Sequence, residues 1–353
     1  MAEKVLMKGN EAVAEAAIQA GCRLFFGYPI TPQTEVSAYM AKRMPKIGGT
    51  FLQAESEVAA INMVYGAAGA GARVMTSSSS PGISLKQEGI SYIVGSDLPC
   101  VIINIVRGGP GLGGIQPAQS DYFQAVKGGG HGDYHLIVLA PSSIQELVDM
   151  TQDAFDIADQ YRMPVMIMGD GMLGQMMEPV EFGAKEGRKL REKTWAANGT
   201  EGKRERNIIN SLYIEASDLE DLVLARYERY KEVEKNEVKW EEYMMDDAEY
   251  VISAYGTIAR VAKTAIHALR AEGIKVGLIR PITLWPFPTE VYKKAAETAK
   301  GFLTVEMSMG QMVEDVRLAV NGKKPVEFFG RTGGIVPTPD EICDALRKMK
   351  EGK

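Results

Sequence analysis

Residues 100–114 read CVIINIVRGGPGLGG, and this stretch decides the fold. An apolar, β-branched run over residues 101–106 ends directly in Arg107 and a series of glycines. Such a run is typical of a buried strand in a parallel sheet. A charged residue at the end of a buried strand needs a partner, and the glycines let a ligand approach the backbone. The stretch therefore predicts an open α/β sheet whose ligands bind beyond the carboxyl ends of the strands.

Similar strand-like runs recur through the first half of the chain. They cover residues 23–27, 74–76, 136–139 and 164–168. Residues with helical spacing separate them, over 11–20, 56–71 and 143–160. Alternation of this kind predicts an α/β fold, a doubly wound parallel sheet with helices on both faces, over residues 1–180.

The composition changes after this first unit. Residues 181–247 are rich in Lys, Arg and Glu, and strand signals vanish there. Apolar residues keep a helical spacing, which predicts a charged helical connector with one long helix; they are Leu219, Val223, Tyr227, Tyr230 and Val233. Strands and helices alternate again over residues 248–353, which predicts a second α/β domain, with a closing helix that begins near Thr338 and Asp340.

Charge and composition exclude several classes of protein. The 353 residues carry a net charge of -6, which argues against nucleic acid or an anionic membrane as partner. No apolar run could span a bilayer, and the half-polar first residues predict no signal peptide, so a cytoplasmic protein is expected. The three cysteines are scattered and form no CxxC pair, which predicts reduced thiols and no cysteine-ligated cluster on this chain.

Two candidate segments come before the middle of the first unit. Residues 27–32 read GYPITP, a rigid backbone that presents Thr31, although a plain turn before the next helix is the simpler interpretation. Residues 53–60 read QAESEVAA, in which Glu55 and Glu57 flank a helix start. A carboxylate at that position can simply interact with the helix dipole, but Glu57 is followed by Val-Ala-Ala and is expected in a drier place.

Two more candidates follow later strands. Residues 76–82 read TSSSSPG and offer donors to an anion or polar ligand, unless they form only a serine-rich helix cap. Arg107 suits a carboxylate, and a surface ion pair is its alternative role.

A further pattern imitates a metal site. Asp170, in Gly-Asp-Gly, and Asn198 have the separation of a pair that ligates Mg²⁺, but no buried strand precedes Asn198, so we predict no metal site on this chain. His131, in a glycine-rich loop, is interpreted as a solvated side chain rather than a proton carrier.

Taken together and in this order, YPITP, QAESEVAA, TSSSSPG and RGGPGLGG resemble the alpha subunit of 2-oxoacid:ferredoxin oxidoreductases. Residues 253–257 (SAYGT) and 278–286 (LIRPITLWP) resemble the transketolase C-terminal-like domain of that family. The resemblance covers nearly the whole chain. It is strongest to the subtype acting on 3-methyl-2-oxobutanoate (2-oxoisovalerate), and the 2-oxoglutarate subtype is close.

The resemblance implies a function shared between polypeptides. Family members oxidatively decarboxylate a 2-oxoacid to an acyl-CoA, with coenzyme A as co-substrate, and pass electrons to ferredoxin. The resemblance implies a thiamine diphosphate pyrimidine-binding fold here. A beta subunit is then expected to carry the diphosphate and Mg²⁺, and gamma and ferredoxin-like subunits to complete the complex with its iron–sulfur clusters.

The resemblance also implies roles for particular residues. Glu57 matches the catalytic glutamate that hydrogen-bonds the pyrimidine N1′. Arg107 matches the arginine that binds the substrate carboxylate, and Thr31 the threonine near the substrate carbonyl. The backbone of Tyr28, Pro29 and Ile30 matches the pyrimidine pocket wall. Two other possibilities stay open, namely the pyrimidine domain of a different thiamine enzyme and a non-catalytic scaffold of the same fold.

Overall fold

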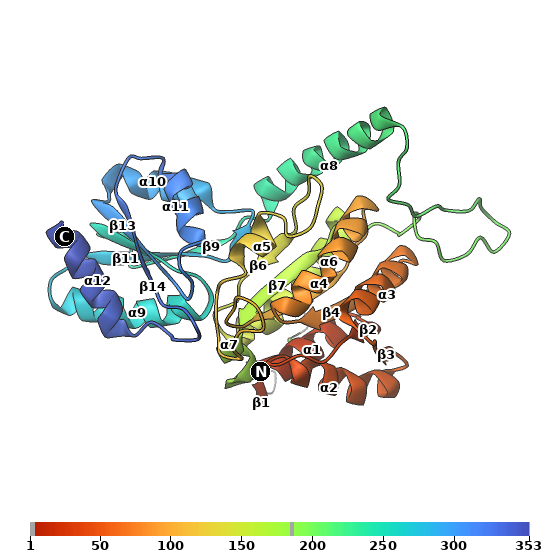
Figure 1. Ribbon diagram of the computed structural model, residues 1–353, viewed down its shortest axis with the longest axis horizontal. Coiled ribbons are helices and arrows are strands. Elements are labelled where there is room, and N and C mark those ends of the chain that lie inside the picture. Colours follow the sequence, from red (N-terminus) through yellow and green to blue (C-terminus); the bar gives the residue numbers. More distant parts are fainter. Residues whose placement is uncertain (1–3, 184–186, 353) are drawn as a thin grey trace.

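A computed structural model describes residues 4–183 and 187–352, and a seven-stranded sheet organises the first half (Figure 1). Its strand order is β12-β6-β7-β5-β4-β2-β3, and every neighbouring pair is parallel except β12 with β6. The strands are β2 (Leu24–Gly27), β3 (Thr50–Gln53), β4 (Val74–Ser78), β5 (Val101–Val106), β6 (Ile137–Leu139), β7 (Val165–Asp170) and β12 (Thr283–Trp285).

Helices cover both faces of this sheet, as the sequence predicts. One packed group is α1 (Gly9–Gln19), α2 (Thr34–Arg43) and α6 (Ile144–Tyr161), and the other is α3 (Glu57–Gly69) with α4 (Pro81–Gly95). Right-handed crossovers require these groups to lie on opposite faces, because β4→β5 and β6→β7 run in opposite directions across the sheet. Shorter elements complete the unit: η1 (Met44–Ile47), α5 (Tyr122–Val126), α7 (Gly171–Gln175) and the antiparallel pair β1 (Lys4–Lys8) and β8 (Met177–Glu181).

A second sheet, ordered β14-β13-β10-β11-β9, organises the C-terminal part. Its strands are β9 (Trp240–Tyr243), β10 (Tyr250–Ser253), β11 (Val276–Pro281), β13 (Gly301–Glu306) and β14 (Val326–Gly330). Four helices accompany them, α9 (Gly256–Ala271) packing on α12 (Pro339–Glu351) and α10 (Thr289–Thr298) on α11 (Met312–Val320). The predicted start of the closing helix is confirmed, since Thr338 and Glu341 form a reciprocal capping box.

Five strands lie where the sequence does not predict them: β1, β3 and β8 of the first unit, and β9 and β12. β9 falls within the connector, where strand signals were expected to vanish, and pairs antiparallel with β11. It is an edge strand with the half-polar sequence WEEY, so no apolar run marks it. β12 belongs by sequence to the second domain but pairs with β6 of the first sheet. This pairing joins the two sheets. We propose residues 1–180 as the first domain, 181–247 as the connector and 248–353 as the second domain, which do not fold as independent bodies.

The long connector helix, α8 (Ala216–Asn236), is present but only partly packed. Its C-terminal half buries Tyr230 and Val233, which are 2% and 0% exposed. Its N-terminal half projects from the body of the protein (Figure 1), and Leu219 there is 44% exposed. The predicted apolar stripe therefore contacts the core over only half its length. No helix of the described residues is both long and apolar enough to cross a membrane.

A buried arginine ties the two sheets together. Arg280 on β11 donates from both Nη atoms to the carboxylate of Glu146 on α6, at 2.7 and 2.8 Å. Glu241 on β9 pairs with the same guanidinium at 2.7 Å. Burial raises the pKa of Glu146, but the hydrogen bonds and charge of Arg280 outweigh burial, so the net effect lowers it. Arg280 therefore stabilises the folded chain most where Glu146 is ionised.

Replacing Arg280 with Met should lower the free energy of unfolding by about 2–4 kcal/mol at neutral pH, because it removes the ion-pair partner of Glu146 and leaves Glu241 with Lys263 alone. The loss should shrink as the pH falls below 4.5, the ordinary pKa of a glutamate, because Glu146 then takes up a proton in the unfolded chain while it stays ionised in the folded one. Urea unfolding at pH 7 and pH 4 measures both effects. The control Arg347→Met, which breaks exposed pairs with Glu272 and Asp344, should cost less than about 1 kcal/mol.

Candidate active site

Four neighbouring strands of the first sheet direct the candidate segments to one edge. β5, β4, β2 and β3 are consecutive in the sheet and parallel, so their carboxyl ends meet at the same edge. Residues 27–32 follow β2, Glu57 follows β3, the serines follow β4, and Arg107 follows β5. The fold therefore gathers the predicted site residues where ligands of open α/β sheets bind.

Glu57 is the first residue of α3 and is only 6% exposed. Ser56 caps this helix through its side chain, which accepts from the Ala59 backbone N–H at 3.2 Å. No residue in the described ranges hydrogen-bonds the Glu57 carboxyl group. Glu55, two residues earlier, is exposed. A buried carboxyl group without a protein partner is the arrangement expected where a ligand provides the partner.

Gly82 at the start of α4 makes room for that carboxyl group. A Cβ added at Gly82 would stand 2.1 Å from Ser78 Oγ and 2.7 Å from Glu57 Oε1. Both distances are shorter than real contacts allow, so any larger residue would displace one of the two side chains. The buried Ser78 hydroxyl itself has no partner among the described residues. The close approach of α3 and α4 thus depends on a glycine at this position.

Arg107 is 6% exposed and is held by backbone carbonyl groups. Nη1 donates to the Thr31 carbonyl oxygen at 2.8 Å, and Nη2 donates to that of Leu112 at 3.0 Å. Its Nε has no partner among the described residues, and none of them provides a carboxylate within ion-pair distance. The alternative of a surface ion pair is therefore wrong for Arg107. A buried guanidinium with donors to spare is suited to a carboxylate ligand.

The segment after β2 lies directly beside Arg107. Thr31 is exposed, and Tyr28, Pro29 and Ile30 are half-buried, so they can line a pocket. The next helix begins at Thr34, so Thr31 does not open it. Fully buried Gln33 fixes the segment, because its amide donates to the Tyr28 carbonyl at 3.3 Å and accepts from the Ser77 hydroxyl at 2.6 Å.

A buried polar cluster fixes the serine segment. Ser80 has a φ of 26°, which residues other than glycine rarely adopt. Its hydroxyl donates to Asp121 Oδ2 at 2.7 Å and accepts from the Arg107 backbone N–H at 3.1 Å, while Asn104 donates to Asp121 at 3.0 Å. Burial raises the pKa of Asp121, although Asn104 and Ser80 oppose the shift. Since the Ser80 side chain makes no capping hydrogen bond, the segment is more than a serine-rich cap.

Sequence reasoning missed Gln33, Asn104, Asp121 and also Lys86, a fully buried lysine on α4. For Lys86 a signal existed. Gly82, Lys86, Ile90 and Ile93 recur at helical spacing, which places the lysine on the apolar face of its helix. The other three lie in turns or on an all-buried strand, where no periodicity distinguishes them.

The residues of the apparent metal pattern lie apart. Asp170 caps α7, accepting from the backbone N–H groups of Met172 and Leu173 at 2.9 and 3.0 Å. Asn198 instead accepts a hydrogen bond from Arg204. The next residue back, Ala197, donates its backbone N–H to the carbonyl of Gly69, at the end of α3. This places Asn198 at the opposite edge of the sheet from Asp170.

His131 is exposed and packs against Tyr92 in the last turn of α4, whereas Glu57 faces the first turn of that helix. The structure does not bring His131 to the candidate site.

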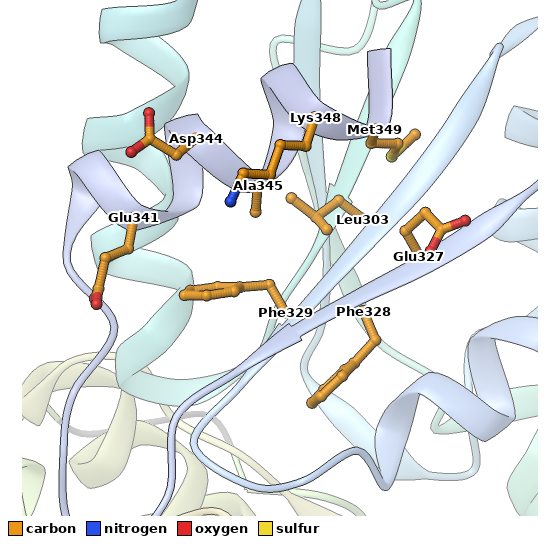
Figure 2. A pocket seen from close by; sticks show the side chains of 9 residues that line it. All are labelled: Leu303, Glu327, Phe328, Phe329, Glu341, Asp344, Ala345, Lys348 and Met349. Carbon is orange, nitrogen blue, oxygen red and sulfur yellow. The ribbon is translucent and has the colours of Figure 1, made fainter. Parts of the chain in front are cut away.

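A hollow elsewhere in the molecule is a weaker candidate. A cavity of about 330 Å³ opens between α12 and β14 of the C-terminal sheet, and Figure 2 shows Phe329, Glu341 and Lys348 around it. Its lining contains none of the predicted site residues. It combines separate acidic, basic and apolar side chains without a buried unpartnered group, so the edge formed by β5, β4, β2 and β3 remains the candidate active site.

Comparisons with known proteins agree with this arrangement. Residues 15–246 match the family described as pyruvate flavodoxin/ferredoxin oxidoreductase, thiamine diphosphate-binding, and residues 248–342 match pyruvate:ferredoxin oxidoreductase core domain II. The chain belongs to this family of 2-oxoacid oxidoreductase subunits. The predicted resemblance and the α/β fold class are thereby confirmed.

Its relatives point to particular members of the family. The chain is 51% identical to the ketoisovalerate oxidoreductase subunit VorB of Methanothermobacter marburgensis, over 98% of this chain and 97% of that one. It is 36% identical to the 2-oxoglutarate synthase subunit KorA of the same organism, over 99% of this chain and 100% of that one.

Two solved structures are similar. The 2-oxoglutarate:ferredoxin oxidoreductase from Magnetococcus marinus, with 2-oxoglutarate, coenzyme A and succinyl-CoA bound, aligns with TM-score 0.89 and 30% identity. The alignment covers 98% of this chain, which spans 65% of the length of that one. A split-gene transketolase, an inactive beta4 tetramer, aligns with TM-score 0.61 and 15% identity over 97% of both chains, which shows the shared fold alone.

Gly82→Ala should destabilise the chain by about 1–3 kcal/mol, because the new methyl group collides with Ser78 and Glu57. The control Gly66→Ala lies in the last turn of α3, where an added Cβ meets nothing within 4 Å. That change should stabilise by up to about 1 kcal/mol through helix propensity. Thermal or urea unfolding of both variants checks the pair, and equal effects would show that α4 has room to move.

Proposed function

We propose that the chain is the pyrimidine-binding subunit of a thiamine-dependent oxidoreductase that converts 3-methyl-2-oxobutanoate (ketoisovalerate) to an acyl-CoA and passes the electrons to ferredoxin. The observation that carries the proposal is the buried Glu57 carboxyl group, which has no partner among the described residues. Thiamine diphosphate, when bound, would supply a nucleophilic carbon, C2, for the reaction with the oxoacid. The greater identity to VorB than to KorA supports ketoisovalerate over 2-oxoglutarate.

The surroundings of Glu57 fit the pyrimidine of that cofactor. The Glu57 carboxyl group is bonded to no described residue, so it is available to exchange a proton with a ring nitrogen. The half-buried Tyr28, Pro29 and Ile30 provide the neighbouring wall. Glu57 is the proposed catalytic residue, and Glu55 is left to solvent.

Arg107 and Thr31 are proposed to hold the substrate. The remaining Nη protons of Arg107 can meet a carboxylate, and its buried Nε has no other partner among the described residues. Because Arg107 already bonds the Thr31 carbonyl, the two residues are fixed relative to one another. A 2-oxoacid bound there has its carboxylate on Arg107 and its carbonyl near the exposed Thr31 hydroxyl.

The remaining components are proposed to come from partner subunits. The described residues at this edge fit a pyrimidine ring, but they offer no group of acidic side chains for a metal, and Asp170 is engaged with helix α7. A beta subunit that carries the diphosphate and Mg²⁺ would complete the site from the other side. Gamma and ferredoxin-like subunits would carry the iron–sulfur clusters, and the assembled enzyme would work in the cytoplasm with coenzyme A and ferredoxin.

Glu57→Gln should lower turnover of the assembled complex by about 10²–10⁴-fold, because an amide has the shape of the acid but cannot exchange its proton. Exchange of the cofactor C2 proton for deuterium, followed by NMR, should slow in parallel. The matched control Glu55→Gln changes an exposed side chain and should alter neither rate. If Glu57→Gln left both rates unchanged, the chain would be a scaffold or would hold another group at this edge.

Arg107→Ala should raise KM for the 2-oxoacid by the equivalent of about 2–4 kcal/mol and leave KM for coenzyme A nearly unchanged. Arg107→Lys, which keeps the charge but not the planar fork, should give an intermediate value. Steady-state kinetics with each substrate varied separately measures the difference. Equal increases for both substrates would mean that Arg107 only supports the backbone of the site.

A further inference from the structure

Lys86 is a cation enclosed behind the candidate site. It is 0% exposed and lies on α4 one turn after Gly82, so it extends from the same face of the helix. Nζ donates to the buried Thr76 hydroxyl at 2.6 Å and, at 3.4 Å, to the Ser77 carbonyl on β4. A lysine is almost never fully buried unless it is paired. No carboxylate among the described residues lies within ion-pair distance of it.

The charged and titratable groups that face Lys86 are few. Burial lowers its pKa from 10.5 to about 7, and the charges of Glu57 on α3 and of Cys100 before β5 oppose the shift. Burial raises the pKa of the Cys100 thiol to about 12, so this thiol is neutral at physiological pH. The groups of β4 that contact Lys86 Nζ are uncharged, namely the Thr76 hydroxyl and the Ser77 carbonyl. Glu57 is therefore the acid that the lysine charge acts on.

We propose that Lys86 is a positioning residue whose buried positive charge stabilises the ionised form of Glu57. The inference rests on the proposed function. When the Glu57 carboxyl proton passes to a ring nitrogen of the ligand, an anion is left on a side chain that is only 6% exposed. Such an anion costs free energy unless a cation or hydrogen-bond donors compensate it, and Lys86 provides the cation from behind.

The geometry suits an indirect role better than direct contact. Gly82 and Ser78 stand beside the Glu57 carboxyl group, and Lys86 lies one turn deeper, bonded to Thr76. The Glu57 carboxyl group consequently keeps its hydrogen-bonding capacity for the ligand. A direct salt bridge would occupy that capacity and would hold Glu57 permanently ionised.

The test compares Lys86→Met, which removes the charge at similar length, with wild type and with Glu88→Gln. Glu88 lies two residues later on the exposed face of α4, so its change removes one charge that faces solvent. Exchange of the cofactor C2 proton is followed by NMR from pH 5.5 to 8.5 in the assembled complex. Lys86→Met should slow exchange by about tenfold near pH 6, the order expected for loss of one nearby buried charge. The profiles should converge above about pH 8, where Lys86 of the wild type has lost its proton.

A second measurement needs no cofactor and also covers the case in which the variant assembles poorly. Because the folded-state pKa of Lys86 is lowered, the folded chain gains stability as the pH rises from about 7 toward 10.5, where only the unfolded chain keeps the proton. The Lys86→Met variant lacks this gain. The difference in unfolding free energy between Lys86→Met and wild type should therefore change steadily in favour of wild type as the pH rises, while Glu88→Gln should run parallel to wild type.

The outcomes separate the two proposals. If Glu57→Gln stops C2 exchange but Lys86→Met gives the same pH profile as Glu88→Gln, the role of Lys86 is refuted and the proposed function stands. If Lys86→Met slows exchange equally at every pH, the lysine is only a structural support through Thr76. If Glu57→Gln itself has no effect, the proposed function fails first. In the Glu57→Gln background, Lys86→Met should have no further effect on exchange.

Discussion

A carboxyl group that is withdrawn from water must find a hydrogen-bond partner, and at Glu57 the described part of the chain provides none. Several elements of the first domain place Glu57 in this buried position. β3 delivers the residue to the sheet edge, the cap at Ser56 begins its helix, and Gly82 lets the neighbouring helix approach. The folded chain thus keeps one acid available for a group that it does not itself contain.

The same edge shows how a rigid frame can be assembled from backbone contacts. Arg107 bonds two carbonyl groups, Gln33 bridges the Tyr28 carbonyl and Ser77, and Ser80 is held by Asp121. Three of these contacts, Arg107 with Thr31, Gln33 with Ser77 and Ser80 with Asp121, join segments that belong to the ends of different strands. At this edge the groups left without a partner among the described residues include the Glu57 carboxyl group and the Arg107 Nε, where a ligand is proposed to bind.

The sequence predicts the first sheet well because its central strands are continuous apolar runs ended by glycine or proline, as in residues 100–114. It predicts edge strands poorly. β9 reads WEEY and β12 is three residues long, and both are defined by their partners β11 and β6 rather than by their own pattern. Pairing between residues more than 100 positions apart, as between β12 and β6, cannot be deduced from local periodicity.

For the site, residue order and neighbours distinguished Glu57 from Glu55, since Val-Ala-Ala predicts burial for the former. The supporting residues Gln33, Asn104 and Asp121 could not be predicted, because their role depends on contacts between segments far apart in the sequence. Asp121 bonds Ser80, 41 residues away, and no local signal marks such a pair.

The central claim is that the partner of Glu57 is the pyrimidine ring of thiamine diphosphate, and a structure of the complex assembled with its partner subunits and cofactor tests this most directly. The account predicts a Glu57 carboxyl oxygen within about 2.6–3.2 Å of the pyrimidine N1′, with Tyr28, Pro29 and Ile30 along the ring. A cofactor bound elsewhere, or Glu57 paired with a side chain of a partner subunit, would contradict it.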